Sequence, residues 1–222
     1  APLSTKGRKQ GPEKVLPNKN AKIRVVYEKI KQAFAKKGIV AQIDPVSAKI
    51  YLHISNTRTL NTKTKDWLQK MVPVYAEALF ADKEIADSIE QVAIEGYSSP
   101  PFKQSYLNPM TKGHPGKELN AKVSELRSKE IASYIKKINS AEFSYKHKLL
   151  DKLKVVGKGM ANPAWSEQNV QELKKTMGDN VSEYLEGNDL PQNAKLIESE
   201  KCGPFDCDKS RRIEFSIKLK QQ

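Results

Sequence analysis

The stretch ELNAKVSELRSKEI, residues 118–131, is the part of the sequence on which the fold prediction depends most. Its apolar residues, and those just after it, recur at steps of three to five residues, which predicts an amphipathic helix. A polar row of Asn120, Ser124 and Arg127 lies at positions i, i+4 and i+7, so these side chains stack on one side of the same helix. The apolar positions are Val123, Leu126, Ile131, Tyr134, Ile135 and Ile138.

The polar row allows two interpretations. An amide, a hydroxyl and a guanidinium in one line can hold a carboxylate and its neighbouring peptide groups, because arginine offers a planar fork of donors. Most polar rows on helices are solvated faces, and the spacing alone favours that simpler interpretation. The segments around the helix are therefore needed to distinguish a ligand-binding row from a solvated face.

Three other segments supply this context. Residues 92–99, VAIEGYSS, predict a short strand that runs into a glycine turn, and residues 210–219, SRRIEFSIKL, predict a strand with alternating apolar residues. Residues 157–163, GKGMANP, place two glycines ahead of a proline. Together with the helix, these segments make four landmarks in one order, which is a strong signal, whereas any one of them alone would be weak.

This order resembles the OmpA-like peptidoglycan-binding domain family. That family has a strand ending in Gly-His/Tyr-Thr-Asp, a helix with Asn-x-x-Leu-Ser-x-x-Arg-Ala, a Gly-x-Gly segment before a proline, and a last strand with Arg-Arg-Val-Glu. The resemblance covers about two thirds of the chain or more, with long insertions. The matching positions are Gly96, Tyr97, Ser98 and Ser99 in the loop, Asn120, Val123, Ser124, Arg127 and Ser128 in the helix, and Arg211, Arg212, Ile213 and Glu214 in the strand.

The resemblance implies a non-catalytic periplasmic domain that anchors an envelope complex or membrane protein to peptidoglycan. The implied partner is the stem peptide, held through its diaminopimelate carboxylate. Asn120, Ser124 and Arg127 are expected to hold this ligand. Residues 96–99 are expected to form the opposing wall, with support from Arg211 or Arg212.

One position departs from the family pattern. Ser99 stands where the family has the aspartate that takes the diaminopimelate ammonium, and no acidic residue lies between Glu95 and Glu118. A carboxylate–ammonium contact contributes a few kcal/mol less its desolvation cost, whereas a serine hydroxyl contributes about 1 kcal/mol. The affinity for a diaminopimelate stem is then expected to fall roughly ten- to a hundredfold.

Three outcomes of this departure stay open. The domain binds peptidoglycan weakly and relies on avidity in an oligomer, or it accepts a different stem peptide, or it has lost wall binding. In the last case it serves as a protein–protein interaction or dimerisation module, for example in a MotB-type stator. An outer-membrane protein or a lipoprotein is an equally compatible parent.

The composition bounds the class of protein. The chain has 222 residues and a net charge of +13, from 39 Lys and Arg against 26 Asp and Glu. The lysines are dispersed and no basic motif with interleaved aromatics occurs, so we expect no nucleic-acid partner. No apolar run approaches the length of a membrane span. We expect a periplasmic domain, tethered to the inner or outer membrane by an anchor outside this sequence, with a possible homodimer or envelope-complex subunits as partners.

The two cysteines, Cys202 and Cys207, flank a Gly-Pro turn. The spacing excludes a redox Cys-x-x-Cys motif, and His53, His114 and His147 lie too far away in sequence to complete a zinc site. A local disulfide in an oxidising compartment is favoured, and two free thiols are the alternative. Some OmpA-like domains carry a disulfide in this region, which agrees with the resemblance.

Nothing in the sequence predicts catalysis. Ser98, Ser99 and His114 share one loop, but no oriented acid completes a triad. Asp206 and Asp208 beside the second cysteine do not resemble a metal-binding loop. We expect no enzyme activity, no metal and no cofactor.

The predicted fold is α+β, a small mixed β-sheet with helices packed on one face and with helical and loop insertions. Residues 1–20 are predicted to be a flexible basic linker and 21–222 an OmpA-like domain, with core motifs at 90–139 and 153–219 and a helical insertion at about 164–187. Further helices are predicted at 21–37, 61–81, 140–152, 166–177 and 182–185, strands at 39–43, 49–54, 91–96, 153–158 and 212–219, and loops at 97–117 and 188–209.

Overall fold

The computed structural model describes residues 19–54, 60–99, 116–178 and 202–221. Several predictions fall outside these residues and are not tested. They are nearly all of the basic linker, most of the loop at 97–117, the helical piece at 182–185 and most of the loop at 188–209.

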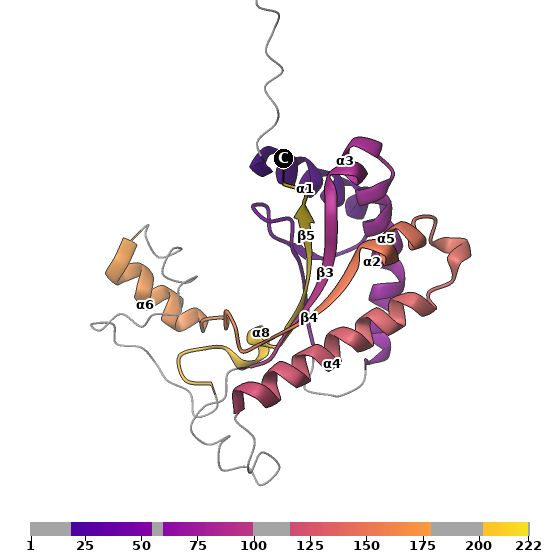
Figure 1. Cartoon of the computed structure of the whole chain (residues 1–222). Helices are drawn as coiled ribbons and strands as arrows, with labels where there is room; N and C mark the ends of the chain where they lie inside the picture. Colours follow the sequence, from indigo (N-terminus) through magenta and orange to yellow (C-terminus); the bar gives the residue numbers. More distant parts are fainter. Residues whose placement is uncertain (1–18, 55–59, 100–115, 179–201, 222) are drawn as a thin grey trace, which may run out of the picture.

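A mixed five-stranded sheet forms the centre of the molecule (Figure 1). Its strand order is β1-β2-β5-β3-β4, so the last strand of the chain lies between β2 and β3. All neighbours are antiparallel except β3 and β4, which run parallel. The strands are β1 Gln42–Ile43, β2 Ile50–His53, β3 Ile89–Tyr97, β4 Leu153–Gly159 and β5 Arg212–Leu219.

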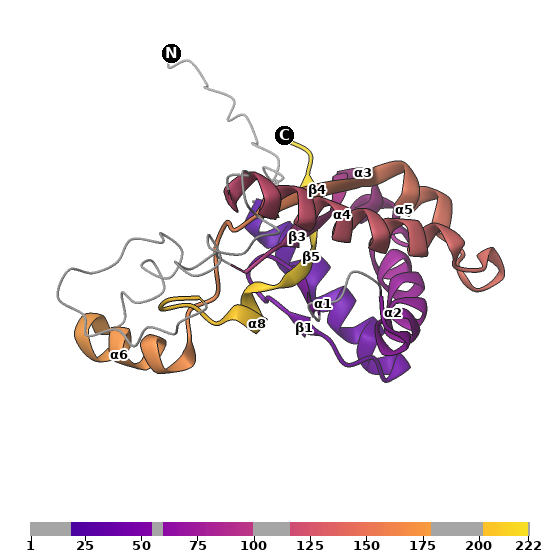
Figure 2. The same ribbon diagram turned by 90° about the horizontal axis from the view of Figure 1, so that it is seen from below.

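The helices of the main body lie together against one face of the sheet, and α6 projects away from them in both views (Figures 1 and 2). The structure is therefore α+β with a mixed sheet, as the sequence predicts. The helices are α1 Lys19–Lys37, α2 Thr62–Phe80, α3 Lys83–Ser88, α4 Gly116–Lys137, α5 Lys146–Lys152, α6 Glu167–Met177 and α8 Cys207–Ser210, with a short 3-10 turn at Ser140–Glu142.

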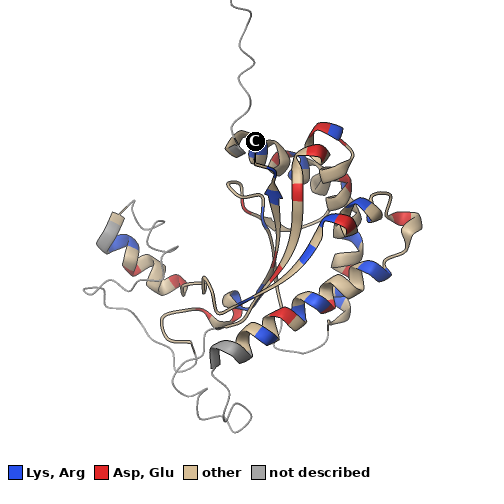
Figure 3. Ribbon diagram, viewed as in Figure 1, with Lys and Arg blue, Asp and Glu red and all other residues tan. Residues whose placement is uncertain are grey.

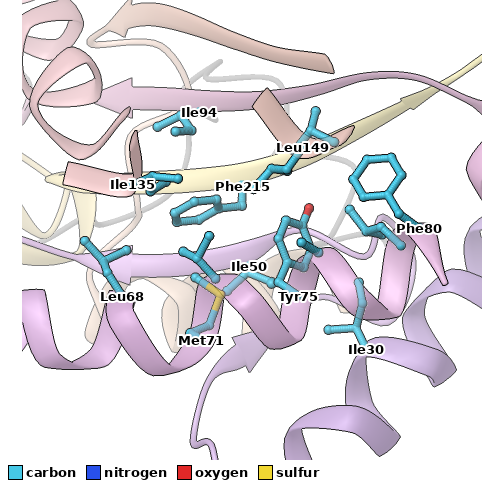
Figure 4. Packing of buried hydrophobic residues seen from close by; sticks show 14 of the residues in the cluster. Ile30, Ile50, Leu68, Met71, Tyr75, Phe80, Ile94, Ile135, Leu149 and Phe215 are labelled. Atoms are coloured by element: carbon cyan, nitrogen blue, oxygen red, sulfur yellow. The ribbon is translucent and has the colours of Figure 1, made fainter. Parts of the chain in front are cut away.

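One hydrophobic core joins the sheet to this helical layer (Figure 4). Phe215 of β5 meets Tyr75 of α2 edge to face, with ring centroids 6.1 Å apart. The alternation of β5 brings Ile213 and Leu219 to the same face, where both are buried. The predicted core face of the last strand is confirmed.

Several boundaries differ from the prediction. Strand β3 begins at Ile89, and the unpredicted helix α3 precedes it, because the Asp82 side chain accepts from two backbone N–H groups at its start. Helix α2 keeps nearly the predicted bounds and contains Pro73 in its interior. Strand β1 has only two residues, and the nearby Val40 carbonyl accepts from the Trp67 indole at 2.9 Å, outside any ladder.

Candidate functional site

Helix α4 lies very close to strands β3 and β4 because glycines face it. A Cβ atom at Gly157 would lie 2.7 Å from the Ala121 carbonyl oxygen, nearer than real Cβ contacts come. A Cβ at Gly96 would overlap the Ser124 carbonyl and the Ser128 hydroxyl. Glycine at these two positions allows the backbones to approach and fixes the height of the helix over the sheet.

The serines of α4 fill this contact. Ser124 and Ser128 are both fully buried. The Ser124 hydroxyl donates to the Ala121 carbonyl at 2.8 Å and accepts from the Gly159 N–H at 2.9 Å. The Ser128 hydroxyl donates to the Ser124 carbonyl at 3.0 Å.

Two predictions for α4 are corrected by this packing. Ser124 does not reach solvent, so its side chain holds the helix to the sheet and does not face a ligand. Leu126, predicted on the apolar face, is 54% exposed. The small serines occupy the sheet-facing side of the helix, which turns Leu126 outward. Asn120 is partly exposed near the start of the helix.

Arg127 flanks this packed face, and it lies near enough to Arg211, from the far end of the sequence, for their charges to interact. Burial and the positive charge of Arg211 both lower the pKa of Arg127. Arg211 immediately precedes β5 and forms an ion pair with Asp208 of α8. The Nε atom of Arg211 is buried and has no hydrogen-bond partner within the described part of the chain. The fold thus brings two predicted site residues, one from the helix motif and one from the strand motif, into one electrostatic neighbourhood.

The loop motif lies at the same end of the sheet. Tyr97 pairs with Arg212 in the antiparallel β3–β5 ladder. Ser98, the residue after Tyr97, therefore lies at the same end of the sheet as Arg211, the residue before Arg212. The Ser98 N–H donates to the Gly159 carbonyl at 2.7 Å. Its hydroxyl is buried, and no described residue accepts from it or donates to it. Ser99 is partly exposed.

Tyr97 and Arg212 belong to the opposite face of the sheet. The Arg212 guanidinium stacks on the Tyr97 ring at 4.0 Å from the centroid, and its Nε donates to Glu214 at 2.8 Å. Burial and the charge of Glu214 raise the pKa of Tyr97. The structure therefore separates Arg212 and Tyr97 from Arg127, and Arg211 is the strand residue that lies with Arg127.

The disulfide between Cys202 and Cys207 is present, with Cα atoms 5.6 Å apart. It leads directly into α8, whose start is capped by Asp206: the carboxylate accepts from the N–H groups of Asp208 and Lys209, each at 2.9 Å. The predicted pin just before the last strand is confirmed. It orients the short helix from which Asp208 reaches Arg211.

Sequence reasoning missed Asp208 as part of this neighbourhood. The family aspartate lies in the loop after β3, and in this chain that loop has no acidic residue before Glu118. Asp208 comes from the other end of the chain, and its i, i+3 spacing to Arg211 was the available signal.

The charged residues are distributed unevenly over the described helices (Figure 3). Lys and Arg are interspersed with Asp and Glu along α4 (Figure 3), whereas Glu28 is the only acidic residue of the Lys- and Arg-rich helix α1. Within the described ranges, no three His, Cys, Asp or Glu side chains are grouped so that they could hold a metal ion. None of the described helices is both long and apolar enough to span a bilayer.

No protein-family model matches the sequence, and no curated protein matches it. Among solved structures, the chain is similar to the crystal structure of a protein provisionally described as MotB-like, from Desulfovibrio vulgaris. The two share 14% identity with a TM-score of 0.43, over 90% of this chain and 92% of that chain. The likeness concerns the fold only and assigns a role to no residue.

Proposed function

We propose that this protein is a non-catalytic envelope domain that binds the stem peptide of peptidoglycan at the neighbourhood of Arg127 and Arg211. In this proposal the diaminopimelate carboxylate is gripped by the two guanidinium groups. Asn120 and the Ser98 hydroxyl supply further hydrogen bonds, and Ser99 lies at the margin. The domain would work in the periplasm, linked to a membrane-bound partner or anchor.

The electrostatic interaction between Arg127 and Arg211 is the observation that carries the proposal. Burial, and then the repulsion between the two like charges, lower the pKa of Arg127. A carboxylate bound between them would relieve the repulsion and accept charge-assisted hydrogen bonds from both. The buried hydroxyl of Ser98, unpartnered within the described residues, is a second polar group that a ligand could satisfy.

Asp208 partly replaces the missing family aspartate in this proposal. Its side chain is 86% exposed and is already paired with Arg211. In the proposed complex it places a carboxylate beside the bound zwitterionic centre of diaminopimelate, where it attracts the ammonium. Binding is then weaker than with an aspartate at position 99, but still selective for a ligand that carries both charges.

Co-sedimentation with purified sacculi tests the proposal. The parent is expected in the pellet, with Arg127→Ala and Arg211→Ala in the supernatant. Lys129→Ala is the matched control, because it removes one positive charge from an exposed position of the same helix. Equal pelleting of Arg127→Ala and Lys129→Ala, with release of both by salt, would show binding by net charge alone and would refute the site.

The serine at position 99 favours a second candidate function, protein–protein interaction. A domain that keeps this fold but lacks the family aspartate is also suited to protein–protein contact or dimerisation, for example in a MotB-type stator. Analytical ultracentrifugation of the parent, together with the sedimentation assay on Ser99→Asp, separates the two. If the parent self-associates and only Ser99→Asp pellets with sacculi, this second function is the correct one.

A further inference from the structure

Helix α1 has one side buried in the core and an opposite, outward side that is rich in basic residues. Val26, Ile30 and Phe34 are buried, so the residues across the helix from them face outward. The helix lies towards the end of the sheet where β5 ends, away from α8 (Figure 1). The wall-binding proposal makes no use of this helix.

The basic residues of α1 form two rows, one on each flank of its outward side. Lys22, Lys29 and Lys36 follow one another at steps of seven residues, which is close to two helical turns, so they share one flank. Arg24 and Lys31 share the other flank for the same reason. The strip between the two rows is exposed. It consists of Ala21, Val25, Glu28, Gln32 and Ala35.

Most of these basic residues lack a partner of opposite charge within the described ranges. Lys29 is the exception, because its Nζ lies 2.8 Å from the Asp82 carboxylate at the start of α3. Lys31 lies over the ring of Tyr27, with Nζ 5.7 Å from the centroid, a contact that leaves its charge in place. The basic residues that form no ion pair with any described residue are Lys22, Arg24, Lys31 and Lys36.

The shape of the outward side matches a flat partner. Lysine and arginine can lay their stems along a surface and extend their charged groups beyond it. Because the strip between the rows includes two alanines and a valine, both rows can reach one plane together. The surface of a bilayer is such a plane, and anionic headgroups supply the opposite charge. The strip contains no aromatic residue on which a nucleobase could stack.

We propose that the outward side of α1 binds the surface of an anionic phospholipid bilayer, with the helix axis parallel to the membrane plane. Lys22 and Lys36 contact lipid phosphates on one flank, and Arg24 and Lys31 contact them on the other. Each basic residue beside an anionic membrane raises the affinity about fivefold, equivalent to about 1 kcal/mol. The attraction falls off within about 8 Å at physiological salt, so it requires this side of the helix to face the bilayer.

Sedimentation of the full chain with sucrose-loaded vesicles tests this proposal. One set of vesicles contains phosphatidylcholine alone, and the other contains phosphatidylcholine and phosphatidylglycerol in equal amounts. We expect the protein in the pellet only with the second set, and we expect added salt to release it because counterions screen the attraction. Equal pelleting with both sets would overturn the proposal.

Two triple variants with the same net charge locate the contact. One replaces three basic residues of α1 by glutamine, a good helix former, and the other replaces three exposed lysines of α4 that also lie seven residues apart. The α1 variant is expected to bind the anionic vesicles about a hundredfold more weakly than the α4 variant. Equal binding would show that net charge alone is responsible and would refute the α1 surface. The changes are Lys22→Gln, Arg24→Gln and Lys36→Gln in α1, and Lys122→Gln, Lys129→Gln and Lys136→Gln in α4.

Removal of the one acidic residue of α1 gives a test that loss of folding cannot mimic. Glu28→Gln is expected to tighten binding to the anionic vesicles about fivefold. Glu167→Gln makes the same change of charge at an exposed position of α6, which projects away from the main body (Figure 1), and should leave the affinity unchanged. An unchanged affinity in Glu28→Gln, or an equal gain in both variants, would contradict the proposal.

Two further measurements separate the bilayer from other anionic partners and from the wall site. A single-stranded oligonucleotide, at the same phosphate concentration as the anionic lipid, is expected to leave the protein on the vesicles. Its release would assign α1 to nucleic acid and overturn the bilayer as partner. Arg127→Ala should bind the vesicles as the parent does even where binding to sacculi is lost, since this inference does not rest on the wall-binding function. Loss of vesicle binding in Arg127→Ala would place the lipid contact at the wall site and refute the α1 surface.

Discussion

Replacement of Ser124 by alanine tests whether this residue is a packing group or a ligand group. The change leaves the buried Gly159 N–H without its acceptor. An unsatisfied buried donor costs about 1–3 kcal/mol, and the better helix propensity of alanine recovers up to about 0.5 kcal/mol. We expect a net loss of about 1–2 kcal/mol in the free energy of unfolding. For a chain of this length the melting temperature should fall by about 2–8 °C.

Thermal and urea denaturation of Ser124→Ala measure this effect directly. Ser133→Ala is the matched control, because Ser133 lies in the same helix with its side chain exposed. It should change stability by no more than about 0.5 kcal/mol. If the two variants are equally stable, the Ser124 hydroxyl does not hold α4 to β4. The interpretation of Ser124 as a ligand-binding residue would then be favoured again.

Three further perturbations test how the helix, the disulfide and His53 contribute to stability. Gly96→Ala introduces a Cβ that overlaps Ser128 and should cost more than about 3 kcal/mol by denaturation, through overpacking; a loss below about 1 kcal/mol would mean that the helix can move away freely. Reduction of the Cys202–Cys207 bridge opens a short loop and should cost about 2 kcal/mol, whereas an unchanged urea midpoint would show that the bridge constrains nothing. The folded-state pKa of His53 is lowered, so its contribution to stability is present above about pH 6.5 and is lost as the pH falls through the folded pKa; His53→Gln should flatten that part of the pH–stability curve, and an identical curve would contradict it.

Periodic patterns predicted the fold well where tertiary contacts agree with them. Strand β5 has the predicted bounds, because its alternation matches a sheet with one buried face. Ser166 caps α6 as its position before the helix suggests, with its side chain accepting from Asn169 N at 3.3 Å. Helix α3 was missed because it has only six residues, too few for a helical period to register.

The polar row on α4 shows where pattern reasoning fails. Ser124 and Arg127 share a helix side in projection, but one is fully buried and the other flanks the contact. The difference depends on glycines in β3 and β4, because only a glycine-lined surface lets serine act as a core residue. Nothing local to the helix contains that information. The approach of Arg127 to Arg211 likewise depends on the sheet order, which no local pattern specifies.

The central place of β5 has a consequence for how the sheet is completed. It pairs with β2 on one side and β3 on the other, yet it follows every other strand along the chain. Until residues 212–219 are available, the first four strands remain as two separate pairs, each with an unpaired edge. Such edges template association with other chains. This protein therefore depends on late closure of its sheet, and a nascent or clipped chain that lacks those eight residues would be prone to join edge to edge with another copy.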